Sequence, residues 1–335
     1  MLDILLITLN PTLVLFVCIA VGFALRKTNI LGDESAKVLA KLETWVFLPA
    51  LNFATMSEYF TPSTLSTHAT NLILTIIVTI FAIFLAIILS RFFYKENCYE
   101  KNVYQYALTF ANFGYMGAPL VLAVFGDVGY SYYALVNLPL WIGIYTWGMT
   151  KLIPNNAEKG SALKRMFNAP MIAMLLGMIF GITGLGEIFR ATPILSVVTS
   201  TVENLKACMG PVAMLLAGIT IAKFGFVKML KNKKVYLASF FRLILIPAII
   251  LALTFGLKEL ANVVFGISIG NSILFLLFFA FATPLGLNTI VFPEAYGKSA
   301  EEGASMALVS HTLSVITLSV LYMLLVLIVG STPIF

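Results

Sequence analysis

The sequence predicts an all-α polytopic membrane protein of ten transmembrane helices, arranged as two inverted five-helix repeats with crossed broken helices. Three observations lead to this fold class. The chain of 335 residues is 60% hydrophobic and only 11% charged, with a mean hydropathy of +0.98, whereas soluble domains average about 25% charged residues. Apolar segments long enough to cross a bilayer fill nearly the whole chain. Two of these segments contain helix-breaking residues at corresponding places in the two halves.

Ten apolar segments each reach roughly 20 residues, the length that a bilayer core requires. The first lacks a basic leader and is longer than the core of a signal peptide, so we expect it to remain as a span. The polar linker 153–167 divides the spans five and five, which makes 1–152 the first repeat and 168–335 the second. The ten spans are 4–25, 36–57, 68–93, 102–126, 130–152, 168–187, 195–222, 234–257, 268–296 and 303–329.

Lys and Arg gather in the loops that follow odd-numbered spans, with 17 residues there against only Arg190 and Lys258 in the other loops. Because loops rich in Lys and Arg stay in the cytoplasm, we expect the linker 153–167 to be cytoplasmic and both termini to lie outside the cell membrane. The net charge of +6 therefore reflects orientation and does not indicate nucleic acid binding. The 17 residues are Arg26, Lys27, Lys37, Lys41, Arg91, Lys95, Lys101, Lys151, Lys159, Lys164, Arg165, Lys223, Lys228, Lys231, Lys233, Lys234 and Lys298.

Two spans are poor candidates for unbroken helices. The stretch ANFGYMGAPLVLAVFG (111–126) in the first half aligns with ATPLGLNTIVFPEAYG (282–297) in the second. Glycine costs a helix interior roughly 1 kcal/mol relative to alanine, and proline removes a backbone donor. The breakers and polar residues at these places are Asn112, Gly114, Gly117 and Pro119 in the first stretch, and Pro284, Gly286, Asn288 and Thr289 in the second.

The order of such breakers along the two halves indicates an internal repeat. Pro49 in the second span recurs as Pro211 in the seventh, and the two broken spans correspond in the same order. Because each repeat has an odd number of spans, the second must enter the membrane from the opposite face. Chance similarity between apolar sequences is the alternative explanation. In transporters built from inverted repeats, the binding site lies near the midplane between the repeats.

The broken spans suggest an anion site. The start of a helix that begins inside the membrane presents unpaired N–H groups and about half a positive charge, which favours anions. Asn112 and Asn288 add amide donors, and Thr289 adds a hydroxyl. We find no Asp or Glu at either break, which disfavours a sodium/proton antiporter and a cationic substrate. The alternative to an anion site is a structural role, in which the glycines let helices pack closely and the asparagines form hydrogen bonds to a neighbouring helix.

Ionisable residues inside spans are candidates for coupling or gating. We consider Glu43, Glu203, Lys206 and His311 in this role. Glu203 and Lys206 also have the spacing of an ion pair on one helix face, and His311 has the alternative of a packed, uncharged histidine. Arg242 is expected to extend its charged end to the cytoplasmic edge of the membrane.

Four pieces of the chain resemble the auxin efflux carrier family, which includes bacterial malate and malonate permeases and plant auxin exporters. The resemblance implies a fold like that of sodium/proton antiporters and bile acid transporters, with a scaffold from spans 1, 2, 6 and 7 and a transport domain from spans 3–5 and 8–10. It also implies that the broken helices cross at Pro119 and Pro284, with Asn112 and Asn137 as substrate ligands. The four pieces are FLPALNF (47–53), the Asn112…Gly117-x-Pro119 pattern, NAPMIAMLLG (168–177), and Pro284 through FPEAYG (292–297).

One departure from the family concerns the third span. The plant exporters carry an Asp and a Lys there, whereas residues 71–90 of this chain contain no charge. This difference disfavours auxin itself and any mechanism that uses that pair.

The predicted function is secondary active transport of small organic anions by alternating access, with malate, malonate or auxin-like acids as the substrate class. A membrane receptor that binds such an acid without moving it is the main alternative, and a membrane enzyme and a channel are weaker ones. We expect no enzyme activity, no cofactor and no metal, because the sequence lacks catalytic pairs and the three cysteines have no metal-binding spacing. The expected partners are the anion and the lipid bilayer, and a homodimer through the scaffold helices is left open.

Overall fold

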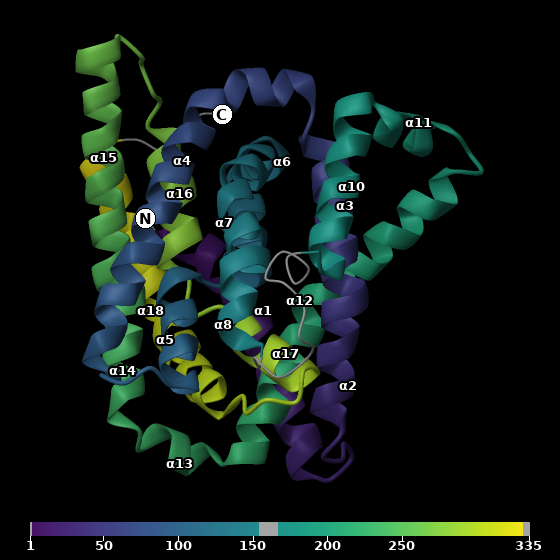
Figure 1. Ribbon diagram of the computed structural model, residues 1–335, viewed down its shortest axis with the longest axis vertical. Helices are drawn as coiled ribbons and strands as arrows, with labels where there is room; N and C mark the ends of the chain where they lie inside the picture. The colour runs from purple at the N-terminus through teal and green to yellow at the C-terminus, as the bar shows by residue number, and fades with distance from the viewer. Residues whose placement is uncertain (1, 154–166, 331–335) are drawn as a thin grey trace.

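The computed structural model describes residues 2–153 and 167–330, and helices dominate these ranges (Figure 1). Apart from one isolated bridged pair, no strand occurs in the described residues, which confirms the all-α prediction. The first half contains α1 (Leu2–Lys27), α2 (Ser35–Leu42), η1 (Glu43–Phe47), α3 (Leu48–Tyr59), α4 (Pro62–Leu89), η2 (Ser90–Phe92), α5 (Tyr99–Thr109), η3 (Phe113–Gly117), α6 (Ala118–Val136), α7 (Leu138–Gly143), η4 (Ile144–Gly148) and α8 (Met149–Leu152). The second half contains α10 (Ala169–Thr183), α11 (Leu185–Ala191), α12 (Ser196–Phe224), α13 (Phe226–Leu230), α14 (Lys233–Phe240), η5 (Phe241–Leu245), α15 (Ile246–Phe265), α16 (Ser272–Ala282), α17 (Asn288–Ala295) and α18 (Glu301–Val329).

Within the described ranges, six helical segments are long and apolar enough to cross a membrane, and the bent pair α10–α11, with 83° between its helices, makes a seventh. The predicted total of ten is not confirmed by this criterion and stays a prediction. Part of the difference has a local cause, because the expected spans 102–126 and 268–296 are each broken into two helices. Most of the predicted cytoplasmic linker lies outside the described residues. The six segments are Leu9–Lys27, Pro62–Phe92, Phe113–Val136, Ser196–Phe224, Lys233–Phe265 and Glu301–Val329.

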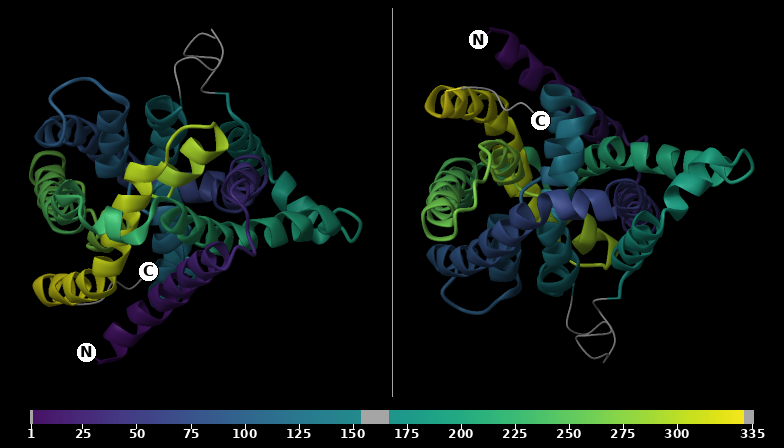
Figure 2. Two further views of the ribbon diagram at one scale, coloured as in Figure 1. Left: turned by 90° about the horizontal axis from the view of Figure 1, so that it is seen from below. Right: turned by 90° about the horizontal axis from the view of Figure 1, so that it is seen from above.

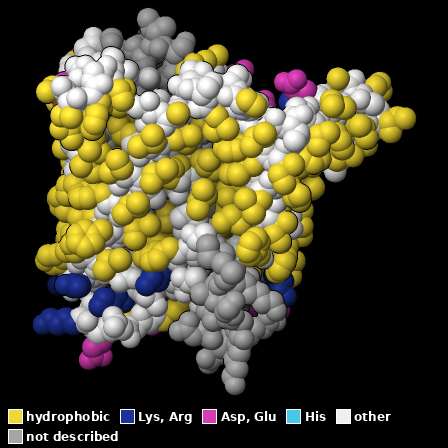
Figure 3. Space-filling model, turned by 45° about the horizontal axis from the view of Figure 1, so that its top comes forward, with side chains coloured by type: hydrophobic (Ala, Val, Ile, Leu, Met, Phe, Trp, Pro, Cys, Tyr) yellow, Lys and Arg dark blue, Asp and Glu magenta, His cyan; other side chains and the backbone are white. Residues whose placement is uncertain are grey.

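Large hydrophobic side chains form a broad exposed belt across the face of the molecule seen in Figure 3. On α4, Ile80 and Phe84 are 63% and 61% exposed, and Val263 on α15 is 80% exposed. Lys and Arg side chains lie along the lower edge of this belt in Figure 3. Soluble monomers rarely expose apolar patches above a few hundred Å². The belt is therefore a lipid-facing surface, as expected for a multi-pass membrane protein.

The helices form two groups that lie side by side (Figures 1 and 2). In one group, α12 packs along α1 and α3, and α3 packs along α10. In the other group, α4 packs on α5, α15 on α16, and α14 on α18. Helix α6 contacts both groups, through α1 and α3 on one side and α4 and α16 on the other. The broken helices belong to the second group, so the first group forms a wall beside them.

Three π-helical turns precede prolines at one fixed spacing. Pro49 follows η1, Pro119 follows η3 and Pro247 follows η5, each by two residues. In an ordinary α-helix, a proline ring clashes with the carbonyl four residues earlier and leaves it without a donor. The wider π turn accommodates the ring, and each is closed by a bond across five residues, such as Ala118 N–H to the Phe113 carbonyl. These prolines therefore shape continuous helices without breaking them.

Two glycines allow α1 and α12 to approach closely. A Cβ added at Gly22 would lie 2.8 Å from the Leu215 carbonyl carbon, and one added at Gly218 would lie 2.7 Å from the Phe23 backbone nitrogen. Small residues at such contacts let helix backbones meet, which is how helices associate in lipid. This contact holds α1 and α12 together in the first helix group.

We expect Gly218→Ala to destabilise the protein by about 1–3 kcal/mol, because the added methyl overlaps backbone atoms that cannot rotate away. The matched control is Gly256→Ala on α15, where no atom lies within 4 Å of the added Cβ. The control should be neutral or slightly stabilising, because alanine is the better helix former. Thermal unfolding of both variants in detergent measures the difference, and equal melting temperatures would contradict the close-packing interpretation.

Candidate anion site at the crossing of two broken helices

The two interrupted segments are hydrogen-bonded to each other at the centre of the fold. The Asn112 N–H donates to the Pro284 carbonyl at 2.7 Å, and the Gly286 N–H donates to the Phe110 carbonyl at 3.2 Å. Ala111 and Leu285 form an antiparallel bridge between these bonds. Each break thus satisfies the backbone groups that the other leaves open, which is required where no water is available. Two broken helices therefore cross here, as the sequence predicts.

The position of the first break differs from the prediction at Pro119. The non-helical residues are 110–112, seven residues or more before Pro119, which lies in the first turn of α6. The π turn η3 absorbs that proline, so the helix continues through it. The second break does lie at the predicted proline. Thr283 is extended because the ring of Pro284 disfavours a helical conformation in the residue before it.

Gly286 permits the close approach of the two breaks. A Cβ at this position would lie 3.0 Å from the Phe110 carbonyl oxygen and 3.1 Å from that of Ala111. Gly114 and Gly117 have a different role, because their added Cβ atoms would meet the Trp141 ring and the Tyr133 hydroxyl. Gly286 thus serves the crossing itself, and the other two glycines serve packing against aromatic side chains.

Arg242 binds the C-terminal ends of both half-helices that lead into the crossing. Its Nη1 donates to the carbonyls of Leu108 at 2.9 Å and Thr109 at 3.4 Å, and its Nη2 donates to the Phe281 carbonyl at 2.6 Å. These carbonyls end α5 and α16, where the helix dipoles are negative. The prediction that Arg242 extends to the cytoplasmic edge is wrong, because its side chain is fully buried. The uncapped carbonyls attract the guanidinium more strongly than water at the edge does.

The opposite end of the first broken helix is left open. Asn112 is the N-cap of η3, yet its side chain makes no capping bond. Within the described chain, the amides of Phe113, Gly114 and Tyr115 have no hydrogen-bond acceptor. These three N–H groups are the unpaired donors that every helix start presents, and here they begin in the middle of the fold. An anion is the natural ligand for such a group of amides.

A cavity of about 860 Å³ reaches these amides from one side of the molecule. Helices α3 and α12 form one wall, and η3 and the start of α6 form the other. Gly114 and Pro119 line the cavity, and Glu203 and Lys206 lie in the α12 wall. The cavity is lined by Thr199 and Ser200 in the first turns of α12, whereas the lysines of the opposite edge begin at Lys223 in the last turn of that helix.

A small recess of about 20 Å³ continues from the cavity, with which it shares Leu51, Gly114, Ala118 and Tyr130. This volume is large enough for about one water-sized group, since one such group needs roughly 10–15 Å³. Asn137 lines the recess and is 1% exposed, and neither side-chain atom makes a hydrogen bond of normal length, although the Tyr133 hydroxyl interacts with this amide. A buried amide without such bonds costs stability unless a ligand satisfies it. Sequence analysis placed Asn137 at the crossing, and the structure brings it beside Gly114.

The remaining predicted site residues do not line this cavity or recess. The Asn288 amide is held by two tyrosines, donating to the Tyr106 hydroxyl at 3.0 Å and accepting from the Tyr115 hydroxyl at 3.2 Å. Thr289 Oγ1 donates to the Gly286 carbonyl at 2.9 Å and so completes the turn after the second break. Asn112 is 1% exposed, and its Nδ2 lies 2.9 Å from Nε2 of His311. Asn288 and Thr289 thus organise the second break.

The candidate coupling residues are dispersed. Glu43 is fully buried in η1, which packs against α12 and α10, and neither carboxylate oxygen makes a hydrogen bond of normal length. Glu203 and Lys206 form the ion pair that their spacing suggests, at 2.9 Å. His311 lies on α18 and contacts Asn112 at the crossing. Of the four, only His311 is bonded to a residue of the broken helices.

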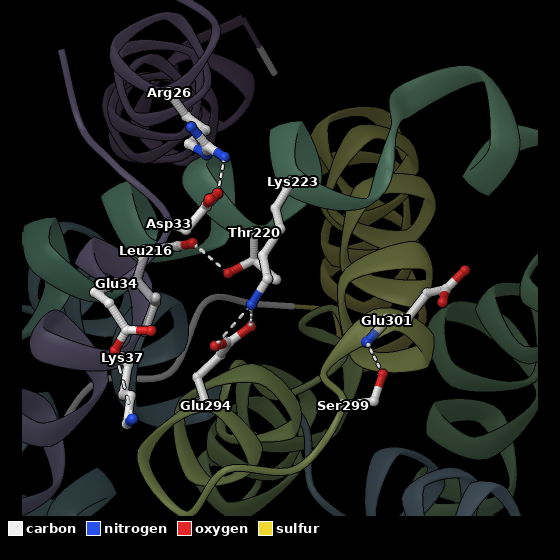
Figure 4. Close-up of polar contacts among 10 residues, drawn as sticks. All are labelled: Arg26, Asp33, Glu34, Lys37, Leu216, Thr220, Lys223, Glu294, Ser299 and Glu301. Carbon is white, nitrogen blue, oxygen red and sulfur yellow. Dashed lines mark hydrogen bonds and ion pairs between the residues drawn. The ribbon is translucent and has the colours of Figure 1, made fainter. Parts of the chain in front are cut away.

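Sequence reasoning missed a second ion pair, which lies at the lysine-rich side of the crossing (Figure 4). Lys223 at the end of α12 donates to both carboxylate oxygens of Glu294 on α17, at 3.0 and 3.2 Å. The Glu294 side chain is 7% exposed and that of Lys223 is 33% exposed. Glu294 falls within the second broken stretch, 282–297, so the expectation of no carboxylate at the breaks overlooked it. The pair joins the two helix groups.

Comparison with known proteins agrees with this architecture. A family model described as a membrane transport protein matches residues 7–162 and 154–322. An uncharacterized transporter of Methanocaldococcus jannaschii is 23% identical over 271 residues, which cover 77% of this chain and 81% of that protein. The two matched segments together cover nearly the whole chain. The chain belongs to the membrane transport protein family, which includes the auxin efflux carriers.

Proposed function

We propose that the protein is a secondary active transporter of small organic anions that works by alternating access. The observation that carries the proposal is the group of free amides at Phe113, Gly114 and Tyr115, which begins a half-helix beside an open cavity. A carboxylate that accepts these N–H groups needs no buried Lys or Arg. The Asn137 amide, which makes no hydrogen bond of normal length, stands in the adjoining recess and supplies a further donor.

The two helix groups correspond to the two bodies that alternating access requires. The first group, with α1, α3, α10 and α12, acts as the scaffold, and the broken helices belong to the moving transport domain. The mutual bonding of the two breaks supports an inverted repeat of five spans each, with both termini outside. The orientation rests on the lysine-rich edge being cytoplasmic, and it makes the present conformation open to the outside.

The path is closed on the lysine-rich side, which the proposed orientation makes cytoplasmic. Helix α17 packs against α2 and α12, and the Lys223–Glu294 ion pair crosses the boundary between the two bodies. Substrate bound at the free amides would reach the cytoplasm only after this contact opens. In the proposed mechanism, this arrangement is one of the two end states of the transport cycle.

Transport into proteoliposomes tests the proposal. Labelled malate, malonate and indole-3-acetate should be compared, and accumulation of at least one carboxylate inside the vesicles is expected. Saturable binding of an acid without any accumulation would instead identify a receptor. Failure of all three acids to bind the purified protein would contradict the anion site.

The variant Asn137→Leu should weaken binding of the transported acid by about 1–3 kcal/mol, because it removes a buried donor that the anion satisfies. Folding should be retained, since the leucine is similar in size and the Asn137 amide makes no hydrogen bond of normal length within the protein. Asn262→Leu on exposed α15 serves as the control and should bind like the wild type. Titration of the acid against tryptophan fluorescence gives both affinities, and an unchanged Asn137→Leu affinity would remove this residue from the site.

A further inference from the structure

Asn112 is an N-cap residue whose side chain makes no hydrogen bond to the first turn of its helix. Asparagine at this position ordinarily accepts a bond from a first-turn amide through Oδ1. Here Oδ1 has no partner, although the residue is buried, and Nδ2 lies 2.9 Å from Nε2 of His311. His311 therefore holds the side chain in an orientation that leaves the first-turn amides free.

The second nitrogen of the His311 ring determines where its proton is. Nδ1 lies 2.9 Å from the carbonyl oxygen of Ala307, which can only accept a hydrogen bond. Nδ1 must therefore carry a hydrogen. In the neutral ring, Nε2 then has no hydrogen and accepts through its lone pair. The Asn112 Nδ2 donates to that lone pair, so the two side chains form one consistent hydrogen-bonded unit.

No charged group is bonded to this unit in the described residues. The small space beside His311 is lined by Thr12, Leu15, Phe16 and Ile19 from α1, Met116 from η3 and Met214 from α12. Arg242 on η5 is occupied by the carbonyls of Leu108, Thr109 and Phe281. On the other elements that pack on α18, the ion pairs include Glu203 with Lys206, Lys223 with Glu294 and Lys228 with Glu301, and none of these residues is hydrogen-bonded to His311 or Asn112. His311 thus has no carboxylate partner to neutralise a second proton.

We propose that His311 is the site of a coupling proton, and that its protonation turns Asn112 into a donor for the substrate anion. A second proton, taken from water, would sit on Nε2 and would need an acceptor. Rotation of the Asn112 amide by about half a turn supplies Oδ1 as that acceptor. Nδ2 then takes the former place of Oδ1 beside the free amides, because an N-cap side chain lies next to the first turn of its helix.

This inference rests on the proposed function and assigns its coupling ion. A buried imidazolium alone is unfavourable, and so is a buried carboxylate alone. Bound together they offset each other, so each should raise the affinity of the protein for the other by the same factor. Anion binding should therefore tighten as the pH falls and weaken as it rises.

The first test reads the proton position directly. The chain has two histidines, and His68→Gln leaves His311 as the one imidazole that ¹⁵N-histidine labelling reports. At pH 8 we expect the neutral ring with hydrogen on Nδ1 and a bare Nε2. A neutral ring with hydrogen on Nε2 would overturn the proposal, whether or not any acid binds.

The second test measures the coupling, with malonate, malate and indole-3-acetate as probes. The protonated fraction of His311 should rise when a binding acid is added at constant pH, and the dissociation constant should weaken by about tenfold per pH unit above the titration of His311. His311→Gln should bind with no such pH dependence, while His68→Gln, on α4 against Tyr132, should keep it. In proteoliposomes loaded with a pH-sensitive dye, uptake should acidify the interior in the wild type and not in His311→Gln.

The outcomes separate this inference from the proposed function. Transport or binding that leaves the protonation of His311 unchanged would overturn the coupling alone. Absence of binding for every acid would overturn the proposed function and the coupling with it.

Discussion

Arg242→Met should lower the stability of the protein by about 3–5 kcal/mol, the loss typical of removing one partner from a buried charged contact. The guanidinium is fully buried and satisfies the carbonyls of Leu108, Thr109 and Phe281. Methionine has a similar length but no donor, so these oxygens would remain buried without partners. The two half-helix ends would also lose the positive charge that offsets their dipoles.

Thermal unfolding in detergent, followed by size-exclusion chromatography of the surviving fraction, measures the effect. Arg190→Met is the matched control, because Arg190 is exposed at the mouth of the cavity and should tolerate the change. Arg242→Lys should fall between the two, since an ammonium cannot reproduce the planar fork that reaches both helix ends. Equal stability of Arg242→Met and the wild type would show that the carbonyl contacts contribute nothing.

Glu294→Gln should open the lysine-rich side of the transporter. Breaking the contact with Lys223 removes about 2 kcal/mol from the closed arrangement, a value reduced because Lys223 is one-third exposed. That corresponds to a shift of roughly 30-fold toward states in which α17 and α12 separate. The conformation with the cavity open on the other side should become correspondingly less populated.

Labelling of a single cysteine reports this opening. Thr220 lies on α12 beside Lys223 (Figure 4), is buried, and can be replaced by cysteine in a background without the three native cysteines. Its reaction with a maleimide should accelerate roughly 30-fold in Glu294→Gln. Glu301→Gln is the control, because its pair with Lys228 is largely exposed and should matter little. The double exchange Lys223→Glu with Glu294→Lys should restore slow labelling, and fast labelling in that variant would argue against an ion-pair gate.

The sequence predicted the parts of the fold that depend on local chemistry. Hydropathy indicated the membrane, and the restriction that Pro284 places on Thr283 located the second break. The first break was placed too late, because a π turn absorbs Pro119 and the true break depends on bonds to Pro284 and Gly286. No local pattern reports those bonds, since their partners lie in the other half of the chain.

The candidate site was predicted in part, for the same physical reason. Gly114, Pro119 and Asn137 line the cavity and its recess, while Asn288 is occupied by two tyrosines that its own surroundings in sequence do not reveal. The rule that a long cation extends to the membrane edge failed for Arg242, because distant carbonyl ends offer it a better environment inside. Polar residues in apolar spans thus indicated correctly which positions lie at the crossing, but they did not indicate which groups each side chain contacts.

The bonds between the two breaks also have a consequence for biosynthesis. Pro284 leaves the ribosome about 170 residues after Asn112, which at typical elongation rates is a delay of roughly 10–30 s. Throughout that interval the backbone groups of residues 110–112 lack the partners that the finished protein gives them. The first half of the protein therefore needs other partners for these groups until the second half is inserted. The translocation machinery, or water at the break, would have to supply them.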